Sequence, residues 1–310
     1  MKIALSQLKP WMMPVAMLTG AVFHEHISSL QPLVPYLIFT MLLIAFCKVK
    51  PSEFRVTSLS WSLLSIQLGG SAAVYLLLRG AGADLAQAAF ICILCPTATA
   101  APVVTGMLGG NVARLATYSI ISNIAAAIAA PACFALIGVH SEMSFLQGVG
   151  LIAAKVAPLI LLPLAIAFFL YWAAPAVHRR IARYQAVSFY LWSVSLIVAV
   201  GGSVSYIMSA DASKIPEIIL IALVAGVICV FQFAVGRKIG RACGDRIAGA
   251  QGLAQKNTIL AIWMALTYLN PISSVGPAAY IVWQNSINSM QLYLKTKKDA
   301  NINRARDVNK

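Results

Sequence analysis

Long apolar runs, separated by short polar or basic segments, make up almost the whole chain. Ten of these runs are close to the length of about 20 residues that an α-helix needs to cross a hydrocarbon core of about 30 Å. None shows the alternation of polar and apolar residues, over about ten positions, that is typical of a membrane-spanning β-strand. The pattern predicts an all-α polytopic membrane protein with ten transmembrane helices. They cover residues 10–25, 30–47, 58–78, 85–108, 113–137, 146–172, 187–209, 216–236, 248–269 and 273–294.

Composition supports this prediction. The 310 residues are 60% hydrophobic and 10% charged, and the mean hydropathy is +0.82. A soluble domain carries about 25% charged residues. The chain has too few charged side chains to cover a surface in water, so its partner is expected to be a lipid bilayer.

The basic residues predict the orientation of the helices. Of the 23 lysines and arginines, 19 lie in the N-terminal segment, in the tail, or in the loops after the second, fourth, sixth and eighth runs, whereas the opposite loops hold only Arg79 and Lys214. Cytoplasmic loops of membrane proteins carry such an excess of positive charge. Both termini are therefore expected in the cytoplasm, in a bacterial inner (plasma) membrane. The same distribution explains the net charge of +14 without a nucleic acid as partner.

Ten helices divide into two halves of five, residues 1–138 and 139–310. Because each half contains an odd number of helices, the two halves enter the membrane from opposite sides. This is the arrangement of transporters built from inverted repeats. The sequence therefore predicts two inverted five-helix repeats, with a basic cytoplasmic tail at the end of the second.

The fourth and ninth runs occupy matching positions in the two halves, and each contains a segment that disfavours regular helix. The fourth contains CPTATAAP, in which Pro96 and Pro102 each remove a backbone donor. The ninth contains QGLAQKNT, with Gly252 among polar residues. Broken helices in matching positions mark the substrate site of inverted-repeat transporters. A binding site is expected where these two segments meet.

Two lysines, Lys155 and Lys256, lie inside the apolar runs, whereas all nine acidic residues lie in loops, at run ends or in the tail. A charge at the centre of a bilayer costs several kcal/mol. Lys256 could reach back toward the interface, could be neutral and bonded to carbonyls of the broken fourth helix, or could bind an anion. Its position in the polar cluster of the ninth run favours the anion. The role of Lys155, among apolar neighbours, stays open.

The remaining polar residues inside the runs are amides and hydroxyls, for which hydrogen bonds between helices are the default role. Their concentration in the third, fifth, ninth and tenth runs predicts a shared cavity. The chain contains no G-x-S-x-G, H-E-x-x-H or Walker pattern, and its six cysteines lack metal-ligand spacing. An enzyme, a bound metal and a resident cofactor are therefore not expected. The amides and hydroxyls inside the apolar runs include Gln67, Ser119, Ser122, Asn123, Gln284, Asn285 and Asn288.

Several of these segments together resemble the bile acid:sodium symporter family. They are KVKPSEFR at residues 48–55, CPTATAAP, GGN at residues 109–111, QGLAQKN and VWQN at residues 282–285. The resemblance implies a core domain (58–137 and 216–294) that moves against a panel domain (10–47 and 146–209). An organic anion would bind between them in symport with two sodium ions.

The resemblance also implies the site residues. Substrate would be bound by Thr97, Thr99, Lys256, Asn257, Gln284 and Asn285. The ion or coupling site would include Gln67, Ala101, Pro102, Ser119, Gln251, Gln255 and Lys256.

At several of these positions the chain differs from the pattern of the family. Ala101 and Pro102 stand where a Ser-Asn pair is usual, Gln251 where a Glu is usual, and Lys256 where an Asn is usual. Leu115 replaces a small hydroxyl residue. A hard cation requires oxygen ligands and negative charge, and these positions offer amides beside an ammonium. Sodium as coupling ion is therefore doubtful.

The sequence predicts a transporter of organic anions, a carboxylate or sulfate that is bile-acid-like or smaller, working by alternating access. The ammonium of Lys256, beside the N-terminal end of a half-helix, would hold the anion. The protein would then work as a proton-coupled transporter, an exchanger or a facilitator. Substrate identity, direction and oligomeric state stay open. The alternatives are a conventional sodium symporter and a membrane receptor or scaffold that does not transport.

Overall fold

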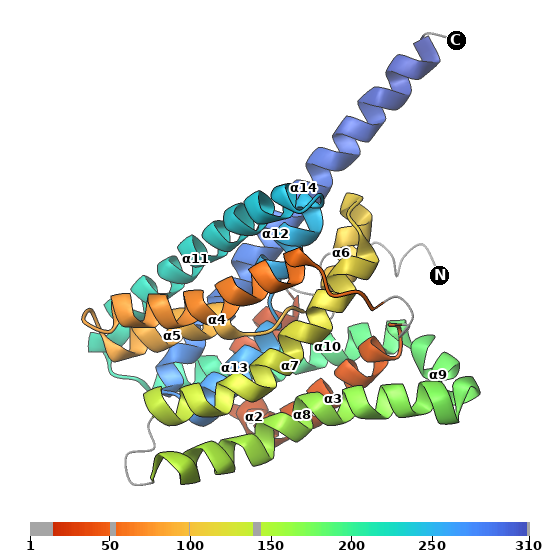
Figure 1. Cartoon of the computed structure of the whole chain (residues 1–310). Coiled ribbons are helices and arrows are strands. Elements are labelled where there is room, and N and C mark those ends of the chain that lie inside the picture. Colours follow the sequence, from red (N-terminus) through yellow and green to blue (C-terminus); the bar gives the residue numbers. More distant parts are fainter. Residues whose placement is uncertain (1–14, 50–53, 99, 139–143, 309–310) are drawn as a thin grey trace.

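The computed structural model describes residues 15–49, 54–98, 100–138 and 144–308, and this part of the chain is helical (Figure 1). Residues 15–22 are helical, and after them the described residues contain thirteen α-helices and three short 3-10 helices. The predicted all-α class is confirmed for these residues. The α-helices are α2 (His24–Ile27), α3 (Val34–Phe46), α4 (Ser58–Leu78), α5 (Ala83–Leu94), α6 (Ala101–Leu108), α7 (Val112–Ile137), α8 (Phe145–Ala173), α9 (Pro175–Ala182), α10 (Gln185–Ser209), α11 (Ile215–Ala242), α12 (Arg246–Ala254), α13 (Thr258–Tyr268) and α14 (Val275–Val308). The 3-10 helices are η1 (Ser28–Leu33), η3 (Ala212–Lys214) and η4 (Pro271–Ser274).

Six helical segments of the described residues are long and apolar enough to cross a membrane, which indicates an integral membrane protein. Four predicted spans do not meet this measure, each for a physical reason. The first begins before residue 15, outside the described residues. The fourth and ninth are broken into the pairs α5–α6 and α12–α13, and the tenth lies in α14, which carries several amides. The six segments are His24–Phe46, Ser58–Leu78, Val112–Ile137, Phe145–Ala173, Tyr190–Ser209 and Ala212–Ala242.

Side-chain caps determine where several helices begin. The Asn111 side chain accepts a hydrogen bond from Arg114 N at the start of α7. The Asp245 carboxylate accepts two from the first turn of α12 and a third, at 2.7 Å, from Asn111 N. Such caps satisfy backbone donors that have no partner within the helix. Asp245 thereby joins the start of α12 to the start of α7.

The helices pack in two groups, which are joined by extensive packing of α7 on α8. In one group, α11 packs on α12, α5 and α14, and α4 packs on α5 and α7; in the other, α3 packs on α8 and α10. Figure 1 shows α11, α4 and α5 crossing one side of the bundle and α8 and α3 the other. The closest approach is between α11 and α12, where a side chain on either Gly236 or Gly249 would collide with backbone of the other. Only glycine permits this spacing, and it holds α12 against the bundle.

Candidate binding site at two broken helices

The two predicted helix breaks lie side by side. After α5 ends at Leu94 and α12 ends at Ala254, the two connecting segments run antiparallel and form a single β-bridge between Thr97 and Lys256. Ala98 N donates to Gln255 O, and Asn257 N donates to Pro96 O, both at 2.8 Å. Each break therefore provides backbone partners for the other. Apolar surroundings tolerate irregular backbone only where such partners exist.

The C-terminal end of α5 is held by three side chains from three different parts of the chain. Gln232 Nε2 donates to Cys92 O at 3.2 Å, Lys256 Nζ to Ile93 O at 2.7 Å, and Gln67 Nε2 to Leu94 O at 2.7 Å. The last carbonyls of a helix lack partners within the helix and carry partial negative charge. The break thus places the ammonium at a position where a cation is stabilised.

Lys256 is 1% exposed, and among the described residues no carboxylate lies within ion-pair distance of its Nζ. Its side chain does not reach back toward the membrane interface. Nζ is bonded to a carbonyl of the broken helix α5, which is the contact predicted by the second alternative, a lysine bonded to carbonyls of the broken fourth helix. The sequence led us to expect the ammonium beside the N-terminal end of a half-helix. The structure places it at the C-terminal end of α5 instead, because the antiparallel bridge turns residue 256 toward α5.

A network centred on Gln67 supports the same helix end. Gln67 Oε1 accepts hydrogen bonds from Tyr118 OH at 2.9 Å and from Ser122 Oγ at 2.7 Å. Ser122 Oγ in turn accepts from Thr97 N at 3.1 Å. Thr97 Oγ1 donates to Gly252 O, which returns the network to α12. All the polar groups of Gln67 are used, so its amide is fixed between α4, α5 and α7.

On the other side of the bridge, amides of α14 contact the break after α12. Gln284 Oε1 accepts from Lys256 N at 2.9 Å, and Gln251 Nε2 donates to Asn288 Oδ1 at 2.8 Å. The Oε1 atoms of Gln251 and Gln255 and the Nδ2 of Asn288 are buried without a hydrogen-bond partner. Buried polar atoms are rarely left without a partner. The two amide oxygens are therefore available to a hydrogen-bond donor or a cation, and the Asn288 amide nitrogen to an acceptor or an anion.

Most of the predicted site residues are brought together by the break, and some are not. Asn285 donates to Ile281 O of its own helix, and the backbone oxygen of Ser119 accepts from Asn123 one turn away. Ala101 and Pro102 form the first turn of α6. Lys155 lies exposed on α8, away from the break. The residues at the break are Gln67, Thr97, Gln251, Gln255, Lys256, Asn257 and Gln284, whereas Thr99 lies outside the described residues.

Sequence reasoning missed three residues of this site. Tyr280 OH donates to Ala254 O at 2.8 Å and accepts from Gln232 Nε2 at 3.0 Å, and Tyr118 OH bonds to Gln67. Gln232 was detectable, because it is an amide within an otherwise apolar stretch. The two tyrosines were not, because an aromatic residue in an apolar run has the same pattern as a packing residue.

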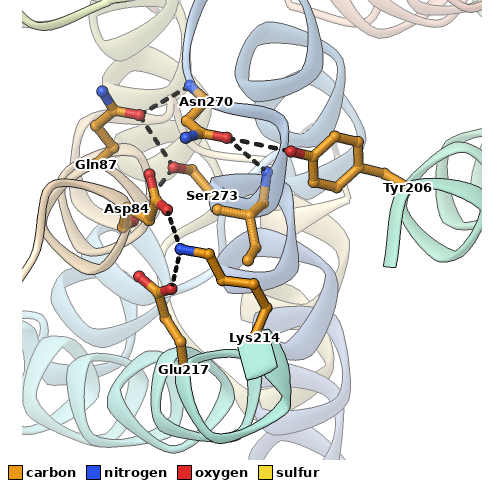
Figure 2. Close-up of polar contacts among 8 residues, drawn as sticks. Asp84, Gln87, Tyr206, Lys214, Glu217, Asn270 and Ser273 are labelled. Atoms are coloured by element: carbon orange, nitrogen blue, oxygen red, sulfur yellow. Dashed lines mark hydrogen bonds and ion pairs between the residues drawn. The ribbon is translucent and has the colours of Figure 1, made fainter. Parts of the chain in front are cut away.

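A second polar cluster lies at the opposite ends of these helices (Figure 2). Lys214 Nζ lies 2.8 Å from Glu217 Oε2 and 3.6 Å from Asp84 Oδ2, which connects α11 to the start of α5. Beside them, Gln87 Oε1 accepts from Asn270 N at 2.8 Å. Tyr206 OH of α10 donates to Asn270 Oδ1 at 3.5 Å, so this cluster also joins the two packing groups.

A cleft of about 540 Å³ opens beside this second cluster, between η1 and α10 on one side and α13 and η4 on the other. Its lining is uncharged and mixes polar residues such as Ser28, Gln31 and Thr267 with apolar ones. It touches α13 at Trp263, Leu266 and Thr267, in the half of this helix that lies away from the break. Its lining includes no described residue of the break.

No model of a known protein family matches the chain, and no curated protein has a matching sequence. The resemblance to the bile acid:sodium symporter family stays a prediction from its motifs.

Proposed function

We propose that the protein is a membrane transporter of small organic anions, carboxylates or sulfates, that works by alternating access without strict sodium coupling. One observation carries the proposal: the ammonium of Lys256 is buried on Ile93 O, at the end of a broken helix, without a carboxylate among the described residues. A buried charge of this kind is expensive, and functional sites are where such charges are kept.

In transporters with broken helices, unwound carbonyls and half-helix C-terminal ends coordinate the driving cation. Lys256 Nζ lies 2.7 Å from a carbonyl of this kind. A sodium ion would need several oxygen ligands and negative charge, whereas Gln251 and Gln255 offer only neutral amides. We therefore assign Lys256 the role of a tethered cation that replaces sodium and leaves the site with net positive charge.

This net positive charge is the reason to propose an anion as substrate. The buried amides of Gln284 and Asn288 lie at the same break. The separate cleft of about 540 Å³ between α10 and the other half of α13 has the volume of a small-molecule pocket, since ligand pockets measure about 300–1,000 Å³.

The proposal includes the finer architecture: ten spans in two inverted repeats, a core and a panel domain, and both termini in the cytoplasm of an inner membrane. Two observations support it. The breaks that bond to each other come from the two halves of the chain, and a cleft separates η1 and α10 from part of α13 and η4. The distribution of basic residues supports the orientation.

The test is a thermal-shift screen of organic anions on the purified full chain, in sodium and in choline buffer, followed by flux into proteoliposomes. We expect stabilisation by one class of carboxylate or sulfate in both buffers, and flux that does not require a sodium gradient. Strong stimulation by sodium would show a conventional sodium symporter. Binding without flux would show a receptor. Lys155→Ala, an exposed lysine on α8, is the control and should keep both activities.

A further inference from the structure

A second pocket, of about 660 Å³, lies near the end of α3, where α8 meets α9. Three cationic side chains line it, Lys48, Arg179 and Arg183. In the described part of the chain none of the three lies within ion-pair distance of a carboxylate, and the pocket lining contains no acidic residue. The pocket is therefore a concentration of positive charge that has no counter-charge from the described residues.

His178, on the inner face of α9, adds a buried polar group to this pocket. Its side chain is 6% exposed and lines the pocket, and its Nε2 has no hydrogen-bond partner. Tyr171 holds the ring by an edge contact, with centroids 5.3 Å apart. Burial, and then the neighbouring charge of Arg179, lower the pKa of His178 below its usual value. An imidazole nitrogen that carries hydrogen can donate to an anion in the pocket.

The pocket continues into an apolar surface that faces outward from α8. Trp172, which lines the pocket, is 75% exposed, and Phe169, three residues earlier on the same helix, is 68% exposed. Leu162, two turns earlier, is 47% exposed. Helix α8 is one of the candidate membrane spans, so these side chains are expected to face acyl chains. Aromatic residues such as Trp172 are typical of the level of the lipid headgroups.

We propose that this pocket binds the phosphate headgroup of an anionic phospholipid of the cytoplasmic leaflet. Arg179 and Arg183 would hold the phosphate oxygens, to which the planar guanidinium donates in pairs, and the His178 ring would donate to the same group. The acyl chains would lie along Trp172 and Phe169. Basic pockets between membrane helices on the cytoplasmic side bind such headgroups. This inference concerns lipid and does not depend on the transport proposal.

The experiment measures binding of phosphatidylglycerol and of phosphatidylcholine to the purified full chain by native mass spectrometry. We expect the wild type to prefer phosphatidylglycerol. The variant Arg179→Gln/Arg183→Gln should lose about 30-fold of that preference, equivalent to about 2 kcal/mol. The matched control Lys238→Gln/Arg241→Gln removes two exposed charges of α11 on the side with the same predicted orientation, outside the pocket. It should keep the preference.

Three results would overturn the proposal. Equal loss in the control would show general attraction to positive charge rather than a site. If inorganic phosphate or glycerol phosphate fully displaced the lipid, the ligand of the pocket would be a soluble anion. If the wild type bound phosphatidylglycerol and phosphatidylcholine equally, the pocket would not be a site for an anionic headgroup. Because the double variant can fail to fold, His178→Phe gives a second measurement: it keeps the ring contact with Tyr171 but removes the nitrogens, and we expect a several-fold loss of preference.

Discussion

Two lysines, Lys214 and Lys256, lie at opposite ends of α5 in contrasting surroundings. The side chain of Lys214 is 47% exposed and lies 2.8 Å from Glu217 and 3.6 Å from Asp84 (Figure 2). Lys256 is 1% exposed and donates from Nζ to the carbonyl of Ile93. One lysine thus has carboxylates and water, and the other has only polar neutral groups and the end of a helix.

The difference shows which of the two lysines is structural. An exposed ion pair contributes little, about 0–1 kcal/mol, because water replaces either partner. A buried charge loses several kcal/mol of hydration, and the single carbonyl bond of Lys256 recovers only part of this cost. Under the proposed function, the bound anion compensates for the rest.

The largest effect is expected for Lys256→Met, which keeps much of the side-chain volume and removes the charge. Affinity for the organic anion found in the screen should fall about 100-fold, or about 3 kcal/mol, because its only buried counter-charge is gone. Isothermal titration calorimetry on the purified variant measures this. Wild-type affinity in the variant would contradict the tethered-cation role, and Lys214→Met is the matched control that should bind normally.

The next effect concerns the amide network under the helix end. Gln67→Leu leaves the Leu94 carbonyl and the hydroxyls of Tyr118 and Ser122 without their shared partner. An unpaired buried group costs about 1–3 kcal/mol, so we expect a loss of about 3 kcal/mol in the free energy of unfolding. The measurement is denaturant or thermal unfolding in detergent.

Gln87→Leu in the outer cluster is the comparison for this variant. Gln87 also accepts two hydrogen bonds, from Asn270 N and Ser273 Oγ, and donates one, to Ile137 O. Its loss should lower stability by a similar amount but leave anion affinity unchanged, whereas Gln67→Leu should lower both. Equal effects of the two variants on anion binding would remove the distinction between the two regions.

A smaller effect is expected from rebuilding a cation site. The double variant Gln251→Glu/Lys256→Asn introduces a carboxylate beside Asn288 and removes the ammonium from the end of α5. If sodium then binds, a concentration about ten times its Kd stabilises the folded state by about 1.4 kcal/mol. The unfolding temperature should be higher in sodium than in choline for this variant, and equal in both for the wild type. Equal temperatures for the variant would show that the break is not a former sodium site.

Hydrophobic pattern predicted α4, α7 and α8 closely because their ends are determined locally. The predicted run 58–78 coincides with α4, and α7 and α8 differ from the predicted runs by at most one residue at each end. Caps at Thr57, Asn111 and Ser144 begin these helices, and a cap depends on neighbours in the sequence. In contrast, α11 and α14 continue past the predicted ends at residues 236 and 294. The two helix breaks were also predicted from local sequence. The break between α5 and α6 was predicted from two prolines, and the break between α12 and α13 from a glycine and a cluster of polar residues.

The direction of the Lys256 side chain could not be predicted from the sequence. It depends on the antiparallel bridge to Thr97, a contact between segments from the two halves of the chain. A one-residue change in that pairing would turn the side chain to the other face. The sequence correctly identified the two segments that meet, but whether the ammonium faces a helix N-terminus or a C-terminus follows only from their register.

The smallest effect is expected for Lys214→Ala, which removes both ion pairs of the outer cluster. Because the Lys214 side chain is about half exposed, water can replace it at Glu217, and only the mostly buried carboxylate of Asp84 loses a partner. The loss in the free energy of unfolding should therefore be the smallest among these variants. High salt screens exposed pairs, so the difference between variant and wild type in thermal unfolding should shrink as salt is raised. A loss as large as that of Gln67→Leu would mean that the outer cluster is as important to the fold as the buried one. The contrast between the two lysines would then rest on anion binding alone.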